Sequence, residues 1–182
     1  MTTLTLAPAA ATAAALLPEP SHSLLRMAIG DDVLAVSIEH VREILQVGRL
    51  TPLPRTPAFV RGVMNLRGAV VPVIDLAARL SGAPAAIGRR SCIVVVEFET
   101  PPVDDDSPPA LLVIGLLVDA VYEVFDCTAA EVEPVPPLGT RVAAKYLSGV
   151  TRAHGAVIGV LALERLLAPD DLAGAIAAFQ PH

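Results

Sequence analysis

Short apolar runs separated by turn-forming residues dominate the hydrophobic pattern of this chain. Two such runs, 24–29 and 33–36, flank Gly30-Asp31-Asp32, a composition that is typical of a β-hairpin. A second pair of runs, 60–66 and 69–76, meets at an Arg-Gly turn in the same way. The pattern therefore predicts two hairpins in the first half of the chain.

Two longer runs, 91–98 and 110–118, are almost wholly apolar, which favours strands that are covered on both faces. Between them, residues 99–109 contain four prolines and three successive aspartates, and we expect a solvated loop there. Strand signals thus outnumber helix signals along the whole chain, and the fold class indicated is mainly β.

Helix signals are confined to two places. Ser37 can cap a short helix whose apolar face would carry Ile38, Val41 and Leu45. Near the end, Pro169 and two acidic residues open a predicted helix and tail over 169–182. The apolar face of this C-terminal helix follows the i, i+3, i+4, i+7 rule through Leu172, Ala175, Ile176 and Phe179.

An internal repeat organises the remaining pattern. The segment 61–80 resembles 148–167, with Gly62 and Val63 recurring as Gly149 and Val150. Upstream, residues 41–44 resemble 121–124, so that Glu43 corresponds to Glu123. Two similar short-stranded units predict two small barrels packed side by side.

Composition limits the classes of function that remain. Hydrophobic residues make up 53% of the chain but aromatic residues only 3%, so the core must be built from Val, Leu, Ile and Ala. No apolar run approaches the roughly 18 residues of a membrane helix, and we expect no direct membrane insertion. A net charge of −6 argues against a nucleic-acid partner. The Ala-, Thr- and Pro-rich segment 1–23 is interpreted as a disordered leader.

Catalytic chemistry is not indicated by the sequence. The four histidines fall in unrelated contexts, and no nucleophile is paired with a base. Cys92 and Cys127 do not have the spacing of a zinc site, and they are interpreted as two reduced thiols of a cytosolic protein. The acidic run 104–106 lacks the neighbours that a hard cation would need. We therefore expect no enzyme activity, no cofactor and no metal.

The segment Thr56-Pro57-Ala58-Phe59-Val60-Arg61-Gly62-Val63-Met64-Asn65-Leu66-Arg67-Gly68, with Val70-Val71-Pro72-Val73-Ile74-Asp75-Leu76 after it, resembles the CheW family of chemotaxis proteins. Weaker matches extend from Leu24 to Leu167. The resemblance implies two five-stranded SH3-like β-barrel subdomains within a CheW-like domain at 24–168, with an approximate split near 85–90.

The function that this resemblance implies is a non-enzymatic scaffold in chemosensory signalling. Its partners would be the cytoplasmic tip of a chemoreceptor and the regulatory domain of a CheA-type histidine kinase. The protein would be cytoplasmic and recruited to membrane-associated receptor arrays. The alternative is a stand-alone SH3-like barrel that binds a peptide or small ligand without a kinase partner.

The resemblance also implies which residues contact each partner. The expected receptor-binding residues are Val41, Glu43, Gly62, Asn65 and Arg67. The expected kinase-binding residues are Glu133 and Leu138, in a proline-rich segment that holds Leu138 on a stiff turn.

Structural roles remain open for several of these residues. Glu43 and Arg67 are predicted to form an ion pair, which can serve stability, contact or both. Glycine at position 62 can mark positive φ or close packing, and Asn65 can satisfy a local turn. If the repeat is structural, Glu123 and His154 should meet as Glu43 and Arg67 do, although His154 also fits an exposed hairpin turn without a partner.

Overall fold

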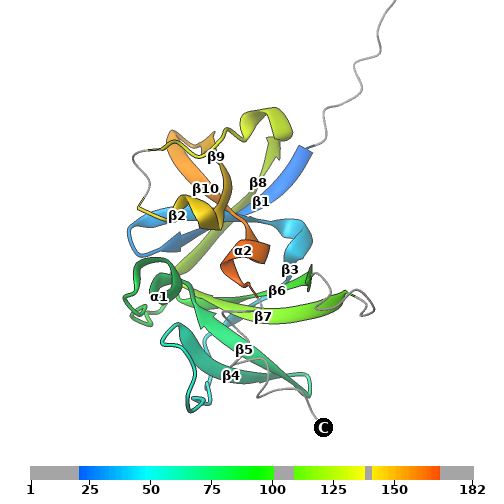
Figure 1. Cartoon of the computed structure of the whole chain (residues 1–182), viewed down its shortest axis with the longest axis vertical. Helices are drawn as coiled ribbons and strands as arrows, with labels where there is room; N and C mark the ends of the chain where they lie inside the picture. Colours follow the sequence, from blue (N-terminus) through cyan, green and yellow to red (C-terminus); the bar gives the residue numbers. More distant parts are fainter. Residues whose placement is uncertain (1–20, 101–108, 138–140, 169–182) are drawn as a thin grey trace, which may run out of the picture.

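The computed structural model describes residues 21–100, 109–137 and 141–168, which form two five-stranded sheets (Figure 1). This confirms the expected mainly β architecture of two units side by side. In chain order the elements are β1 (Ser21–Ile29), β2 (Asp32–Ser37), η1 (Ile38–His40), β3 (Val41–Gln46), β4 (Val60–Leu66), β5 (Ala69–Asp75), α1 (Leu76–Ser81), β6 (Cys92–Thr100), β7 (Ala110–Val118), β8 (Ala120–Thr128), η2 (Ala129–Glu131), η3 (Ala144–Tyr146), β9 (Leu147–Ala153), β10 (Ala156–Leu161) and α2 (Leu163–Leu166).

The two sheets exchange strands between the sequence repeats. Sheet 1 has the order β8-β1-β2-β10-β9, and sheet 2 has the order β3-β6-β7-β5-β4. The first repeat, β1 to α1, therefore gives two strands to sheet 1, and the second repeat, β6 to α2, gives two strands to sheet 2. A parallel pair completes each sheet, β10 with β2 and β5 with β7. Neither sheet is therefore confined to one side of residues 85–90, where the split between the two units was expected.

The main core lies between the sheets. It joins buried apolar side chains of both sheets and of α2, and Figure 1 shows α2 at this boundary. Burying each large aliphatic side chain contributes about 1.5–3 kcal/mol relative to an exposed position. Fully or almost fully buried members of this core are Leu25, Met27, Leu34, Val36, Ile74, Leu76, Val94, Val96, Ile114, Leu116, Leu163, Leu166 and Leu167.

The carboxylate of Asp75 is fully buried where β5 meets α1. Its Oδ1 caps the helix by accepting from the amide of Ala78 at 3.0 Å. Its Oδ2 accepts from the amide of Ala85 at 2.9 Å and from Arg61 Nη1 at 3.0 Å. One side chain therefore fixes the start of α1, the loop after it and the neighbouring strand β4.

The prediction of a helix after Ser37 is wrong. A single 3₁₀ turn, η1, is followed directly by strand β3, and the Ser37 side chain makes no capping hydrogen bond. Burial alternates along β3, with Val41, Glu43 and Leu45 less exposed than their neighbours. In so short a segment, the apolar positions that fit one face of a helix also fit one face of a strand. Pairing with β6 makes this segment a strand.

Other expectations concern the ends and the long loop. The hairpin runs and the two long apolar runs form strands close to the expected bounds. Strand β1 begins at Ser21, within the segment expected to be a leader. Residues 1–20, 101–108 and the predicted C-terminal helix at 169–182 lie outside the described residues. Among the helices that the structure describes, none is long and apolar enough to cross a bilayer.

Candidate functional site

An ion pair connects the two edge strands of sheet 2. Glu43 lies on β3, and Arg67 lies in the turn between β4 and β5. Arg67 Nη2 is 3.1 Å from Glu43 Oε2, which confirms the predicted contact. Since β3 and β4 stand at opposite ends of the strand order, this contact brings the two edges of the sheet together.

Solvent reaches this first ion pair mainly on its arginine side. The Arg67 side chain is 80% exposed and the Glu43 side chain 23% exposed. An exposed pair of this kind contributes at most about 1 kcal/mol to stability, because water screens the attraction. The guanidinium is thus free to contact another molecule while it remains beside the carboxylate.

The second repeat contains the equivalent contact. Glu123 on β8 and His154 in the β9–β10 turn approach with 3.1 Å between Oε1 and Nε2, again joining the two edge strands of a sheet. Arg67 and His154 share the same left-handed backbone, each with φ of 52°. The predicted repeat of the pair is therefore confirmed, and His154 is not an unpartnered turn residue.

Sequence reasoning did not identify Arg26, whose guanidinium also lies beside Glu123. Its Nε lies 3.2 Å from the same Glu123 oxygen, and its guanidinium stands 4.7 Å from the centre of the Tyr122 ring. The Nε contact is electrostatic without the geometry of a directed hydrogen bond. The available signal was a charged residue within the apolar run of β1, where it alternates with the buried Leu25 and Met27.

The remaining residues expected at the receptor surface have different environments. Asn65 Oδ1 accepts from the amide of Gly68 at 3.0 Å, so this side chain holds the β4–β5 turn beside Arg67. Val41 is half-buried against the core between the sheets. Gly62 is buried, has φ of 139°, and packs directly against the backbone carbonyl of Thr51. Only Asn65 and Arg67 of this set are largely exposed.

The expected kinase-binding segment lies on the other unit. Glu133 is exposed and pairs with Val150 of β9 through two backbone hydrogen bonds of 2.7 and 2.8 Å. Thr51 pairs with Val63 of β4 in the equivalent place, with bonds of 2.8 and 2.9 Å. Leu138 lies outside the described residues. The backbone of Glu133 is thus fixed, and its side chain is left available.

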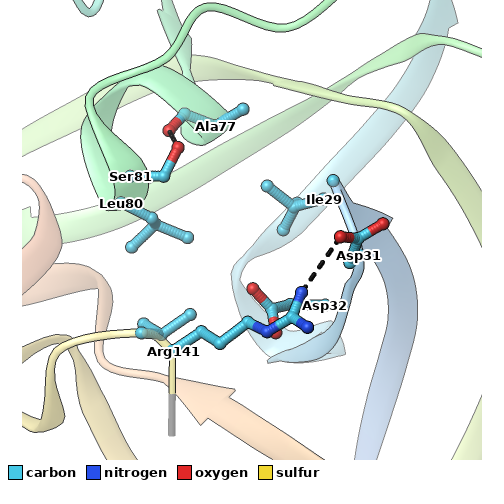
Figure 2. Close-up of a pocket in the computed structure, with 9 residues that line it drawn as sticks. Ile29, Asp31, Asp32, Ala77, Leu80, Ser81 and Arg141 are labelled. Atoms are coloured by element: carbon cyan, nitrogen blue, oxygen red, sulfur yellow. Dashed lines mark hydrogen bonds and ion pairs between the residues drawn. The ribbon is translucent and has the colours of Figure 1, made fainter.

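A groove of about 240 Å³ lies between the units, on the side of the β1–β2 turn (Figure 2). The turn supplies Asp31 and Asp32, α1 supplies Leu80 and Ser81, and Arg141 crosses the groove to reach Asp31 at 3.0 Å. The Ser81 hydroxyl donates to a helix carbonyl, and the lining residues include no histidine or cysteine. The lining combines the apolar side chains of Ile29, Leu80 and Val142 with the charged side chains of Asp31, Asp32 and Arg141.

Both cysteines lie in the part of the chain that the structure describes, where possible metal ligands can also be located. No group of three or more His, Cys, Asp or Glu side chains gathers there in a way that could hold a metal ion. Both cysteines are free, and the buried Cys127 lies with its sulfur 3.3 Å from the Thr151 hydroxyl. Burial raises the pKa of the Cys92 thiol above its ordinary value of 9.0, and a backbone hydrogen bond at Val121 acts in the opposite direction.

Cys92 is therefore expected to react slowly with thiol reagents in the folded protein. Thiolate is the reacting form, and a raised pKa leaves less of it at pH 8 than a free cysteine has. The raised value also means that stability is intact below the unfolded pKa and falls as pH rises above it. The measurement is the rate of reaction with Ellman's reagent in a Cys127→Ser variant, native and in denaturant. A native rate equal to that of free cysteine would contradict the assignment.

Comparison with known proteins gives four consistent matches. A family model described as a CheW-like domain matches residues 23–170. The chain is 38% identical to protein FrzA of Myxococcus xanthus over 164 residues, covering 89% of this chain and 94% of that protein. It is 32% identical to the chemotaxis protein CheW of Rhizobium meliloti over 148 residues, covering 81% and 88%. Among solved structures, the scaffolding protein TtCheW from Thermoanaerobacter tengcongensis aligns with a TM-score of 0.70 at 26% identity, covering 84% and 91%.

Proposed function

Because this chain belongs to the CheW family, we propose that it is a non-enzymatic adaptor that couples chemoreceptors to a CheA-type histidine kinase. The observation that carries the proposal is the match of the CheW-like domain model to residues 23–170, which is most of the chain. The structural neighbour is named a scaffolding protein, in agreement with this role. The adaptor would act in the cytoplasm, at the arrays that its receptors form.

Each partner is assigned to a separate unit. The receptor tip would contact sheet 2 around the first ion pair, through Glu43, Arg67, Asn65 and Val41, with Gly62 supporting the surface from beneath. The kinase regulatory domain would contact the segment that contains Glu133 and Leu138, beside sheet 1. Exposure of Arg67 and of the Glu133 side chain supports this assignment.

Retention of partners by the purified chain tests the proposed function. The immobilised protein is mixed at micromolar concentration with its cognate CheA-type kinase and, separately, with the cytoplasmic fragment of a cognate receptor. Both should be retained, and adding all three should raise receptor-dependent kinase autophosphorylation. Retention of neither partner would overturn the adaptor function and favour a stand-alone barrel.

Arg67→Glu is expected to reduce receptor-dependent kinase activation by about tenfold or more. The reason is that it reverses the charge that the exposed side chain at position 67 presents to the receptor. Stability should change by no more than about 1 kcal/mol, since the ion pair is exposed. Kinase autophosphorylation with receptor present measures the first effect, and urea unfolding measures the second.

A charge exchange separates contact from structure. The double variant Glu43→Arg with Arg67→Glu restores an ion pair of opposite polarity between β3 and the β4–β5 turn. If Arg67 contacts the receptor, the double variant should remain as defective as Arg67→Glu alone. Recovery of activation in the double variant would show that only the pair matters and would remove Arg67 from the contact surface.

A further inference from the structure

Arg79 connects the two units through a hydrogen bond from its side chain to a backbone carbonyl. It lies on α1, which follows β5 of sheet 2, whereas α2 follows β10 of sheet 1. Arg79 Nε donates to the carbonyl of Leu166, the last residue of α2, at 3.0 Å. Carbonyls at the end of a helix have no partner within it, and a guanidinium satisfies one of them with a charge-assisted hydrogen bond. The bond therefore links an element of one unit to an element of the other.

Two aromatic rings hold the same guanidinium, one from each unit. The Arg79 Cζ stands 4.6 Å from the centre of the Phe59 ring and 5.2 Å from that of Tyr146. Phe59 immediately precedes β4 of sheet 2, and Tyr146 immediately precedes β9 of sheet 1. Cation–π attraction to both rings opposes any sliding of one unit against the other.

The residues that contact one another here occupy equivalent positions in the two repeats. Phe59 and Tyr146 have the same separation in sequence as Gly62 and Gly149, and so do Arg79 and Leu166. The backbone repeats the relation, because the amide of Asp75 donates to Phe59 O at 2.8 Å and that of Ala162 to Tyr146 O at 2.9 Å. Arg79 thus contacts Leu166, which is its counterpart in the second repeat, and the equivalent aromatic rings of Phe59 and Tyr146. The second repeat has leucine at this position and supplies no second guanidinium.

We infer that Arg79 is a positioning residue that fixes the orientation of the two units, so that receptor and kinase can be engaged at the same time. The inference rests on the proposed function, in which the two partners contact different sheets. Glu43 and Arg67, assigned to the receptor, pair within the sheet 2 unit, and Glu133, assigned to the kinase, is bonded to Val150 of sheet 1. Binding of one partner should therefore tolerate loss of Arg79, whereas coupling between partners should not.

The test compares Arg79→Ala and Arg79→Lys with Arg165→Ala as the matched control. Arg165 Nη1 also bonds a backbone carbonyl, that of Leu147 at 3.3 Å, but both residues belong to the sheet 1 unit. We expect Arg79→Ala to bind the kinase regulatory domain and the receptor fragment, each tested alone, with affinities within about threefold of wild type. Receptor-dependent kinase activation should fall about tenfold. A loss of this size is what a charged hydrogen bond and two cation–π contacts allow. Arg165→Ala should couple normally, and Arg79→Lys should recover part of the activation because it retains a cation beside the rings.

Orientation is measured separately with spin labels at Val70→Cys and Val157→Cys, in a Cys92→Ser, Cys127→Ser background. These two positions are equivalent in the repeat, lie one on each sheet and are each 52% exposed. Arg79→Ala should broaden or shift the label-to-label distance distribution, and Arg165→Ala should not. An unchanged distribution, or Arg79→Ala coupling as well as wild type, would overturn the inference. Failure of the wild-type chain to bind either partner would instead overturn the proposed function, and the spin-label result would still decide whether Arg79 fixes the orientation.

Discussion

Asp75→Ala is expected to lower the free energy of unfolding by roughly 3–5 kcal/mol, the cost of removing one partner from a buried ion pair. The substitution removes the acceptor of three hydrogen bonds, from Ala78, Ala85 and Arg61. Two backbone amides and a part-buried guanidinium then lose the group that replaced water around them. Urea unfolding followed by circular dichroism gives the measurement.

Asp31→Ala is the matched control for this variant. Asp31 also pairs with an arginine at 3.0 Å, but both side chains are largely exposed, and the expected change is about 1 kcal/mol or less. Asp75→Asn should fall between the two, because the amide oxygen can still cap α1 while the charge is lost. Equal urea midpoints for Asp75→Ala and wild type would show that the buried carboxylate is not needed for stability.

Gly62→Ala is expected to destabilise the protein by about 2–4 kcal/mol, through left-handed backbone strain together with steric overlap. The backbone φ of 139° is unfavourable for any residue with a Cβ, and the added carbon would overlap the carbonyl of Thr51. The Thr51–Val63 bridge, with its two backbone hydrogen bonds, would have to move apart. A loss of signalling in this variant would therefore follow from altered folding rather than from a lost receptor contact.

Gly68→Ala is the control in which an added Cβ causes backbone strain without steric overlap. Gly68 has φ of 89°, and an added Cβ there has no neighbour within 4 Å. Its cost should be limited to the backbone term of about 1–3 kcal/mol. The difference in unfolding midpoint between the two variants measures the close approach at Thr51. If Gly62→Ala were no less stable than Gly68→Ala, the packing assigned to Gly62 would be wrong.

The repeat made part of the candidate site predictable from sequence. The family resemblance and the opposite charges of Glu43 and Arg67 predicted the first contact. The repeat then placed Glu123 and His154 in equivalent positions, and both contacts are present. This succeeded because the spacing between an acid on an edge strand and a base in a hairpin turn is local to one repeat. The Arg26 contribution was not predictable in this way, since it arises from pairing between β1 and β8 across most of the chain.

Tertiary pairing also explains the remaining errors. Residues 41–46 carry apolar side chains at spacings that fit a helix face and a strand face equally, and only the β6 partner distinguishes them. The exchange of strands between repeats has no local signal, because a parallel neighbour is chosen by long-range packing. Asp75 had no recognised sequence signal, because the helix that it caps was not expected, and its burial and its bond to Ala85 depend on the loop after α1.

The exchange of strands has a consequence for synthesis on the ribosome. In sheet 1, β2 pairs with β1 on one edge and with β10 on the other, so that Ala35 is joined to Val160. At ordinary translation rates, the first of these residues leaves the ribosome on the order of ten seconds before the second. During that interval the outer edge of β2 has no native partner, and an unpaired edge is a template for pairing with other chains. Sheet 2 needs only β3 to β7 and is complete in sequence once β7 has emerged, so the nascent protein should carry a finished sheet 2 beside an open sheet 1 until its last strands are made.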